Sequence, residues 1–157
     1  VTAYDNQDGD LTGTGLVELY DLHTTGGRAG NISSRGQVLT GDDVIIGGFI
    51  VGGNQSKKVV VRALGPSLAN SGVANVLSDP TLELHDASGN LISSNDNWAD
   101  GPDAAAIQAE GFAPSQRAES ALQATLNPGS YTAIVRGVNN TSGIALVEMY
   151  DLSPPPN

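Results

Sequence analysis

Short runs of β-branched and other apolar residues, separated by glycine, proline and asparagine, fill most of this chain of 157 residues. Glycine alone occupies 20 positions, which suits tight turns and weakens helices. The runs have the length and composition of strands, and the residues between them are typical of turns. Predicted strands cover residues 43–51, 57–64, 81–86, 91–94, 121–126, 131–136 and 144–152. The pattern predicts an all-β fold, an antiparallel β-sandwich or jelly roll.

Local signals refine this prediction. Residues 81–86 alternate with a period of two, so Leu82 and Leu84 are expected to face the core. The glycine pair at 47–48 indicates a bulge or a close approach of backbone. The link from the first predicted strand to the second is short and turn-like, and it predicts a hairpin. One short helix is expected near residues 102–110, because proline and aspartate begin it and a glycine ends it.

An internal repeat sets the organisation of the chain. The block LVELYDL at residues 16–22 recurs as LVEMYDL at residues 146–152, with six of the seven residues identical and an offset of 130. We therefore predict an N-terminal strand segment, residues 1–22, homologous to residues 131–152, followed by a β-sandwich domain, residues 23–157. The first segment is a candidate donor strand for a neighbouring subunit, or the end of a preceding unit in a tandem array. Alternatively, two sister strands of one sandwich have similar sequences.

Composition excludes several classes of protein. The formal net charge of −10 argues against a nucleic-acid binder, which needs a basic face, and against binding to anionic membranes. The absence of cysteine excludes a disulfide scaffold, a cysteine-ligated zinc site and a thiol nucleophile. No apolar run approaches the 18 residues of a membrane-spanning helix, so no membrane insertion is expected. Because the chain starts at Val1, we expect it to be processed or cut from something longer.

Residues 79–152 carry a recognisable pair of motifs. LELHDASGNLISSNDN at 82–97 combines a strand, a turn, a return strand and an acidic loop, and LNPGSYTAIV at 126–135 follows before Gly143. This stretch resembles the bacterial pre-peptidase C-terminal type of β-sandwich. The resemblance covers somewhat under half of the chain and implies the fold rather than a function.

Two further resemblances indicate an extracellular protein. GLVELYDL at 15–22, NISSRG at 31–36, IGGFIV at 46–51 and VRALGPSL at 61–68 are similar to a repeat domain of large secreted bacterial surface proteins. VTAYDNQDGDLT at 1–12 resembles a motif of bacterial surface immunoglobulin-like domains. Both imply a protein that is secreted or displayed on the bacterial cell surface.

Calcium is the cofactor that the acidic loops suit best, because it prefers oxygen ligands from carboxylates, carbonyls and amides. In relatives of the resembled sandwich, a loop of this kind binds calcium. The alternative for both loops is a solvated acidic turn with its own hydrogen bonds. The first candidate site contains Asn95, Asp96, Asn97, Asp100 and Asp103, and the second contains Asp5, Asn6, Asp8 and Asp10. The second does not have the register of an EF-hand.

The sequence contains no strong signature of a catalytic site. Ser67 lies in GPSLA, which lacks the second glycine of a nucleophile elbow. His23 and His85 are the only histidines, and both are expected at the surface. We predict a non-enzymatic protein, and a hydrolase with an unfamiliar site is the weakest of the alternatives.

Several charged side chains are expected to have structural roles. Arg62 and Arg136 lie in predicted strands and are expected to pair across a sheet with acidic residues, the candidates being Glu18, Glu83 and Glu148. Arg117 and Glu119 share a long connection with Trp98, and we expect the three to clamp that connection, with the arginine stacked on the indole.

The leading functional hypothesis is a structural subunit of an extracellular bacterial filament or pilus-like fibre. Its partners would be copies of itself, joined head-to-tail by β-strand complementation. The first choice for the inserted strand is residues 1–22 and the second is residues 144–152. The expected contacts between subunits are Leu16, Val17, Leu19 and Tyr20 of the first, and Val147 and Met149 of the second.

A different class of function stays open. The chain is alternatively a carbohydrate- or matrix-binding adhesion module from a tandem-repeat secreted protein. That hypothesis requires aromatic side chains gathered on a concave face, and the candidates are Tyr4, Trp98 and Phe112.

Overall fold

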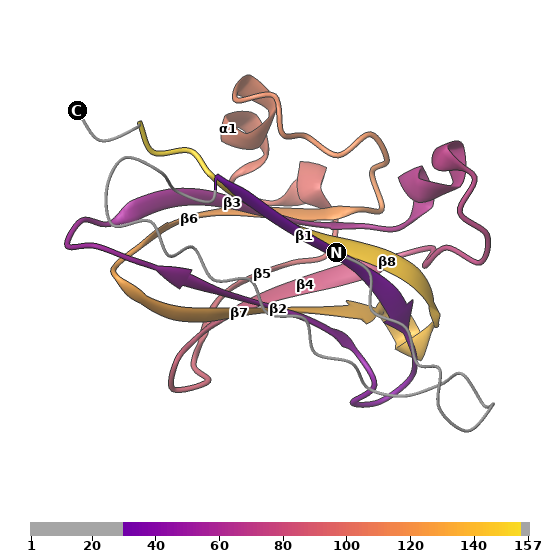
Figure 1. The fold of residues 1–157 in the computed structure, drawn as a ribbon. Helices are drawn as coiled ribbons and strands as arrows, with labels where there is room; N and C mark the ends of the chain where they lie inside the picture. The colour runs from indigo at the N-terminus through magenta and orange to yellow at the C-terminus, as the bar shows by residue number, and fades with distance from the viewer. Residues whose placement is uncertain (1–29, 155–157) are drawn as a thin grey trace.

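The computed structural model describes residues 30–154, which form eight antiparallel strands in two packed sheets (Figure 1). The candidate donor segment, residues 1–22, and its acidic residues Asp5, Asp8 and Asp10 lie outside the described part of the chain. Sheet A contains, in spatial order, β1 (Asn31–Val38), β8 (Gly143–Asp151), β3 (Lys57–Leu64) and β6 (Ser120–Leu126). Sheet B contains β2 (Ile45–Val51), β7 (Gly129–Gly137), β4 (Pro80–Asp86) and β5 (Leu91–Asn95). This order is that of an eight-stranded jelly roll, so the predicted fold class is confirmed.

Short helices lie in the connections. The helix predicted near residues 102–110 is confirmed as α1 (Ala104–Ala109), which lies on the outer side of sheet A (Figure 1). Its Ile107 is fully buried against Val60 of β3 and Ala121 of β6. Three 3₁₀ turns complete the described elements: η1 (Pro66–Ser71), η2 (Trp98–Asp100) and η3 (Val138–Asn140). The covered face of sheet A explains why the middle of β3 is apolar on both sides, with Val59, Val60 and Val61 all buried.

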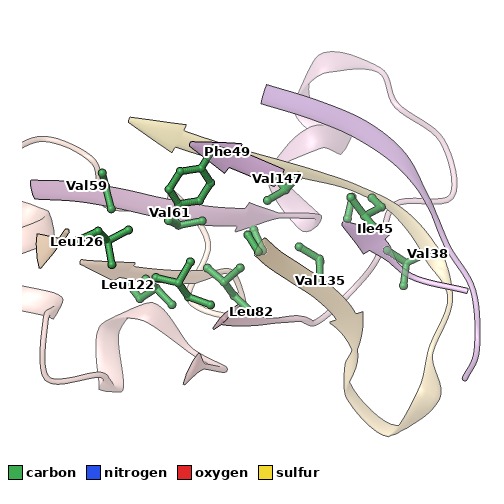
Figure 2. Close-up of a cluster of buried hydrophobic side chains, with 14 of the residues drawn as sticks. Val38, Ile45, Phe49, Val59, Val61, Leu82, Leu122, Leu126, Val135 and Val147 are labelled. Carbon is green, nitrogen blue, oxygen red and sulfur yellow. The ribbon is translucent and has the colours of Figure 1, made fainter. Parts of the chain in front are cut away.

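The main core fills the space between the sheets (Figure 2). Leu82 and Leu84 are completely buried, which confirms the inward phase predicted from their alternation. Phe49 enters from β2 and stacks on Tyr131 of β7 at 5.7 Å between ring centres. Further core residues come from both sheets and from Leu77 in the link before β4, and those of the sheets include Val38, Ile45, Val59, Val61, Leu122, Leu126, Val135 and Val147.

The predicted hairpin between β2 and β3 is wrong. β2 pairs with β7 in sheet B, whereas β3 pairs with β6 and β8 in sheet A. The short link between them therefore crosses from one sheet to the other instead of reversing the chain within one sheet. The reason is burial: Val59 and Val61 face the main core and Val60 faces Ile107 of α1, so the middle of β3 needs cover on both faces, which an interior position in sheet A provides.

Strand β1 was not among the predicted strands. Its sequence NISSRGQV is mostly polar and exposed, and it carries only two large apolar side chains. It becomes a strand because every one of its residues pairs with β8, from Asn31 opposite Tyr150 to Val38 opposite Gly143. Of the glycine pair in β2, Gly47 shows the predicted close approach, because a Cβ there would lie 3.1 Å from the Val147 side chain, whereas a Cβ on Gly48 would meet nothing within 4 Å.

Replacing Gly65 by alanine should destabilise the fold. A Cβ at this position would lie 2.1 Å from the backbone oxygen of Leu77, so one of two buried segments has to move. We expect a loss of about 1–3 kcal/mol of unfolding free energy, as for overpacking of a core. Urea denaturation measures it, with Gly52→Ala as control because nothing lies within 4 Å of that position. Equal stability of the two variants would contradict the close packing.

Candidate functional site

Strand β8, the second copy of the repeated block, lies in the interior of sheet A. It pairs with β1 on one side and with β3 on the other, over residues 143–150 and 146–151 respectively. Val147 is buried in the core and Met149 packs against it. In the single chain these two candidates for contacts between subunits are therefore engaged within their own domain.

The outer side of β8 carries a charged and aromatic cluster. The Arg62 guanidinium from β3 binds Glu148, with its Nε 3.0 Å from Oε2, and its Nη1 donates to the backbone oxygen of Phe112 at 3.1 Å. The same guanidinium lies 5.2 Å from the centre of the Tyr150 ring, and that ring contacts Phe112. Arg62 and Glu148 are both largely buried, so this ion pair ties β3, β8 and the loop after α1 together.

The cross-strand pairing predicted for the two arginines is confirmed by this contact and by a second one in sheet B. There Arg136 lies 3.7 Å from Glu83, which also accepts a hydrogen bond from His85 at 2.9 Å if that ring nitrogen is protonated. This hydrogen bond is the main reason why the pKa of His85 is raised above its usual value. The cluster lies on the outer face of sheet B, but the His85 side chain is only 18% exposed, so it is less open to solvent than expected from the sequence.

The candidate calcium loop after β5 is tied mainly to its own domain. Asp100 accepts a hydrogen bond from Arg117 at 2.7 Å, and the backbone oxygen of Asp96 lies 2.5 Å from the Ser120 hydroxyl. Asn97 accepts a bond from Asn95 through its backbone oxygen. Within residues 30–154, no three His, Asp or Glu side chains are grouped in a way that could hold a metal ion. Calcium binding by this loop stays a prediction.

Two members of that loop have a different role, which is to close the edge of sheet A. β6 is the last strand of the sheet, so alternate N–H groups point away from β3. The Ala121 N–H donates to Asn95 Oδ1 at 3.0 Å, and the Gln123 N–H donates to Asp103 Oδ2 at 3.1 Å. These side chains replace a neighbouring strand, and the loop with α1 covers this side of the sandwich.

A fully buried carboxylate anchors the same connection. Glu119 accepts hydrogen bonds from the N–H groups of Gly65 and Ser67 at one oxygen, at 3.1 and 2.8 Å, and from the Gln116 N–H at the other. Its backbone oxygen accepts the Trp98 N–H at 2.9 Å. The carboxylate therefore fixes both the start of η1 and the return of the long loop. Composition gave no sign of this role, since a lone glutamate in a loop is normally solvated.

The aromatic residues of this region pack inward. Trp98 and Phe112 both contact the small cluster around Ile107, and the Trp98 indole N–H donates to the backbone oxygen of Gln116 at 3.1 Å. The expected stacking of Arg117 on Trp98 is not among the contacts of the described residues, and Arg117 instead makes an exposed ion pair with Asp100. Trp98 and Glu119 do hold the connection, through the backbone bond between them. Tyr4, the third residue of the aromatic hypothesis, lies outside the described residues.

No helix in residues 30–154 has both the length and the apolar character needed to cross a bilayer. The chain matches no protein-family model and shows no significant match to a curated protein. A solved structure similar to it is the pre-peptidase C-terminal domain of collagenase from Bacillus anthracis. The two are 17% identical, with a TM-score of 0.46, and the match covers 76% of this chain and 88% of that one.

Replacing Glu119 by glutamine should destabilise the domain strongly. The amide keeps one acceptor oxygen but turns an NH₂ group toward backbone N–H donors, so at least one buried bond is lost. Hydrogen bonds to a charged group contribute most, and we expect a loss of about 2–3 kcal/mol. Chemical denaturation measures it, with Asp100→Asn as control, because Asp100 is 63% exposed and its surface ion pair contributes less than about 1 kcal/mol. A smaller loss for Glu119→Gln than for the control would contradict the anchoring role.

Asp79 provides a test with a defined pH dependence. Burial, followed by the nearby Asp96, raises the pKa of Asp79, and its Oδ1 is buried without a hydrogen-bond partner. Because the folded state favours the neutral acid, the cost of ionising Asp79 is absent at low pH and grows as the pH rises through the folded-state pKa. Asp79→Asn should therefore raise the melting temperature at pH 7, and the gain should vanish by about pH 3.

The opposite sign is expected at Asp86. Hydrogen bonds from Asn90 and Ser88 lower the pKa of Asp86, so its stabilising effect is present at neutral pH and is lost on acidification. Asp86→Asn should lower the melting temperature at pH 7 and have little effect near pH 3. Thermal unfolding of Asp79→Asn and Asp86→Asn at the two pH values distinguishes the two effects. A melting temperature at pH 7 that changes in the same direction for both variants would refute the opposite pKa shifts.

Proposed function

We propose that this protein is a structural, non-enzymatic subunit of an extracellular bacterial filament or pilus-like fibre. Copies of the chain would join head-to-tail, each lending a strand to the next. The observation that carries the proposal is that the repeated block corresponds to β8, an interior strand of sheet A.

An interior strand has distinctive requirements. β8 needs a strand on each side for its backbone and a core beneath it for Val147 and Met149. Its outer face supplies Glu148 and Tyr150 to the Arg62 cluster. A strand with apolar residues on its core-facing side and with Glu and Tyr on its outer side is suited to the position between a β1-like strand and a β3-like strand.

The first copy of the block retains each of these features. Val17 and Leu19 stand where β8 has Val147 and Met149, and Glu18 and Tyr20 stand where it has Glu148 and Tyr150. In the described domain that position is already occupied by β8. The copy therefore matches a position that another domain has to provide, and a neighbouring subunit of the same sequence type is the simplest source.

The geometry of such a contact favours a polymer. The donated segment and the accepting sheet are different surfaces of one chain, so the contact is heterologous, and it propagates unless the rotation closes a ring. A protein of this kind is secreted or exposed on the cell surface, in keeping with the resemblances at residues 1–12 and 13–152. The adhesion alternative has less support, because Trp98 and Phe112 pack around Ile107 instead of forming an exposed aromatic platform.

The proposal predicts fibres whose formation depends on residues 16–22. Full-length protein at high concentration should form filaments with a regular axial rise in negative-stain micrographs. Leu19→Lys should abolish them, because a charge would enter the core of the accepting sheet. Thr24→Lys, which adds the same charge outside the repeated block, should leave them intact. Isolated globules from the unaltered protein, or fibres from Leu19→Lys, would overturn the proposal.

A further inference from the structure

The edge strands on the two sides of the sandwich differ in how far their free backbone groups are protected. On the side of β5 and β6, the Asn95 and Asp103 side chains accept the outward N–H groups of β6. β5 has only five residues and its pairing with β4 shifts register, which also discourages further pairing. That side of the molecule is protected against edge-to-edge contact.

Strand β2, the edge of sheet B on the other side, has none of these devices. Its seven residues, IIGGFIV, include no charge and no proline, and they pair with β7 in one unbroken register. Ile46 and Ile50 point outward and are 60% and 72% exposed. Within residues 30–154 no other strand pairs with its free edge. A straight, apolar and uncharged edge of this length is the kind of strand to which another strand adds.

We propose that β2 pairs with β2 of a second copy of this chain, antiparallel and centred on Gly48. The strand is complementary to itself about that residue. Ile46 of one copy would lie opposite Ile50 of the other, and Gly48 opposite Gly48. On the inner side, Gly47 would lie opposite Phe49, a pairing in which the ring covers the backbone of the glycine. The result is one sheet of eight strands with two-fold symmetry.

The composition of β2 is compatible with a contact between two copies of an acidic chain. Each copy has a formal charge of −10, yet an uncharged strand brings no carboxylates together in the contact.

Self-pairing of β2 is independent of the head-to-tail contact proposed above. One contact uses the block at residues 16–22, whereas the other uses only described residues of β2. In a fibre, the two-fold contact would join neighbouring filaments sideways, and in the absence of fibres it would give dimers.

Cysteine cross-linking of the full chain tests the register directly. The protein has no cysteine, so any disulfide joins introduced residues only. Opposed residues of an antiparallel pair have Cα atoms about 4.5–5.5 Å apart, within the range of a disulfide. A Cβ at Gly48 meets nothing within 4 Å, so Gly48→Cys should fold normally. Under mild oxidation it should give a covalent dimer on a denaturing gel.

Three controls make the result decisive. Ile92→Cys, exposed on β5, reports chance collisions and should cross-link at least tenfold more slowly. Ile46→Cys alone should also be slow, because its opposite residue is Ile50, whereas Ile46→Cys combined with Ile50→Cys should be fast. Ile50→Lys should remove the cross-link of Gly48→Cys, since it places charges in the contact.

Other outcomes would overturn the inference. Gly48→Cys that reacts no faster than Ile92→Cys refutes self-pairing. If the Gly48→Cys cross-link disappears when Leu19→Lys is added, the pairing of β2 depends on residues 16–22 and is not the independent contact proposed here. A cross-link that persists in that background while fibres are lost supports the sideways contact and separates it from the proposed function.

Discussion

Every sheet that is not closed leaves rows of backbone N–H and C=O groups at its edge strands, and in water each row attracts another strand. Two four-stranded sheets have four such edges, and the described structure shows different treatments of them. Side chains of the loop after β5 bind the edge of β6, β5 is short and irregular, and β2 has no protective feature. In the described residues the side of β5 and β6 is therefore the protected one, and the edge of β2 is the one that our proposal of self-pairing uses.

The closed side depends on groups that hold one long connection in place. Glu119 binds three backbone N–H groups, and the Ser120 hydroxyl lies 2.6 Å from the backbone oxygen of Pro80, to which it can donate. Both residues are fully buried at the start of β6. Because the connection is fixed there, Asn95 and Asp103 reach the outer edge of β6. The acidic loop thus has a structural use that does not require an ion, whether or not calcium also binds.

The repeated block gains meaning from its position in sheet A. As a sequence it indicated only that two parts of the chain resemble one another. Its placement between β1 and β3 shows that the repeated pattern is that of an interior strand, with core-facing and outward-facing residues both specified. The proposed head-to-tail contact and the proposed β2 contact involve different parts of the domain, so together they would give a filament that also associates sideways.

The sequence by itself determined the strands with strong β-branched runs, the short helix and the inward phase of Leu82 and Leu84, because these follow from neighbours close along the chain. Tertiary structure alone decided that β2 and β3 lie in different sheets and that the polar segment NISSRGQV forms β1, since both depend on strands far away in sequence. It also decided the role of Glu119, whose donors at Gly65 and Ser67 lie more than fifty residues away. Local patterns specify which face of a strand is buried. The partners of its backbone and of a buried charge are chosen only when the two sheets close on each other.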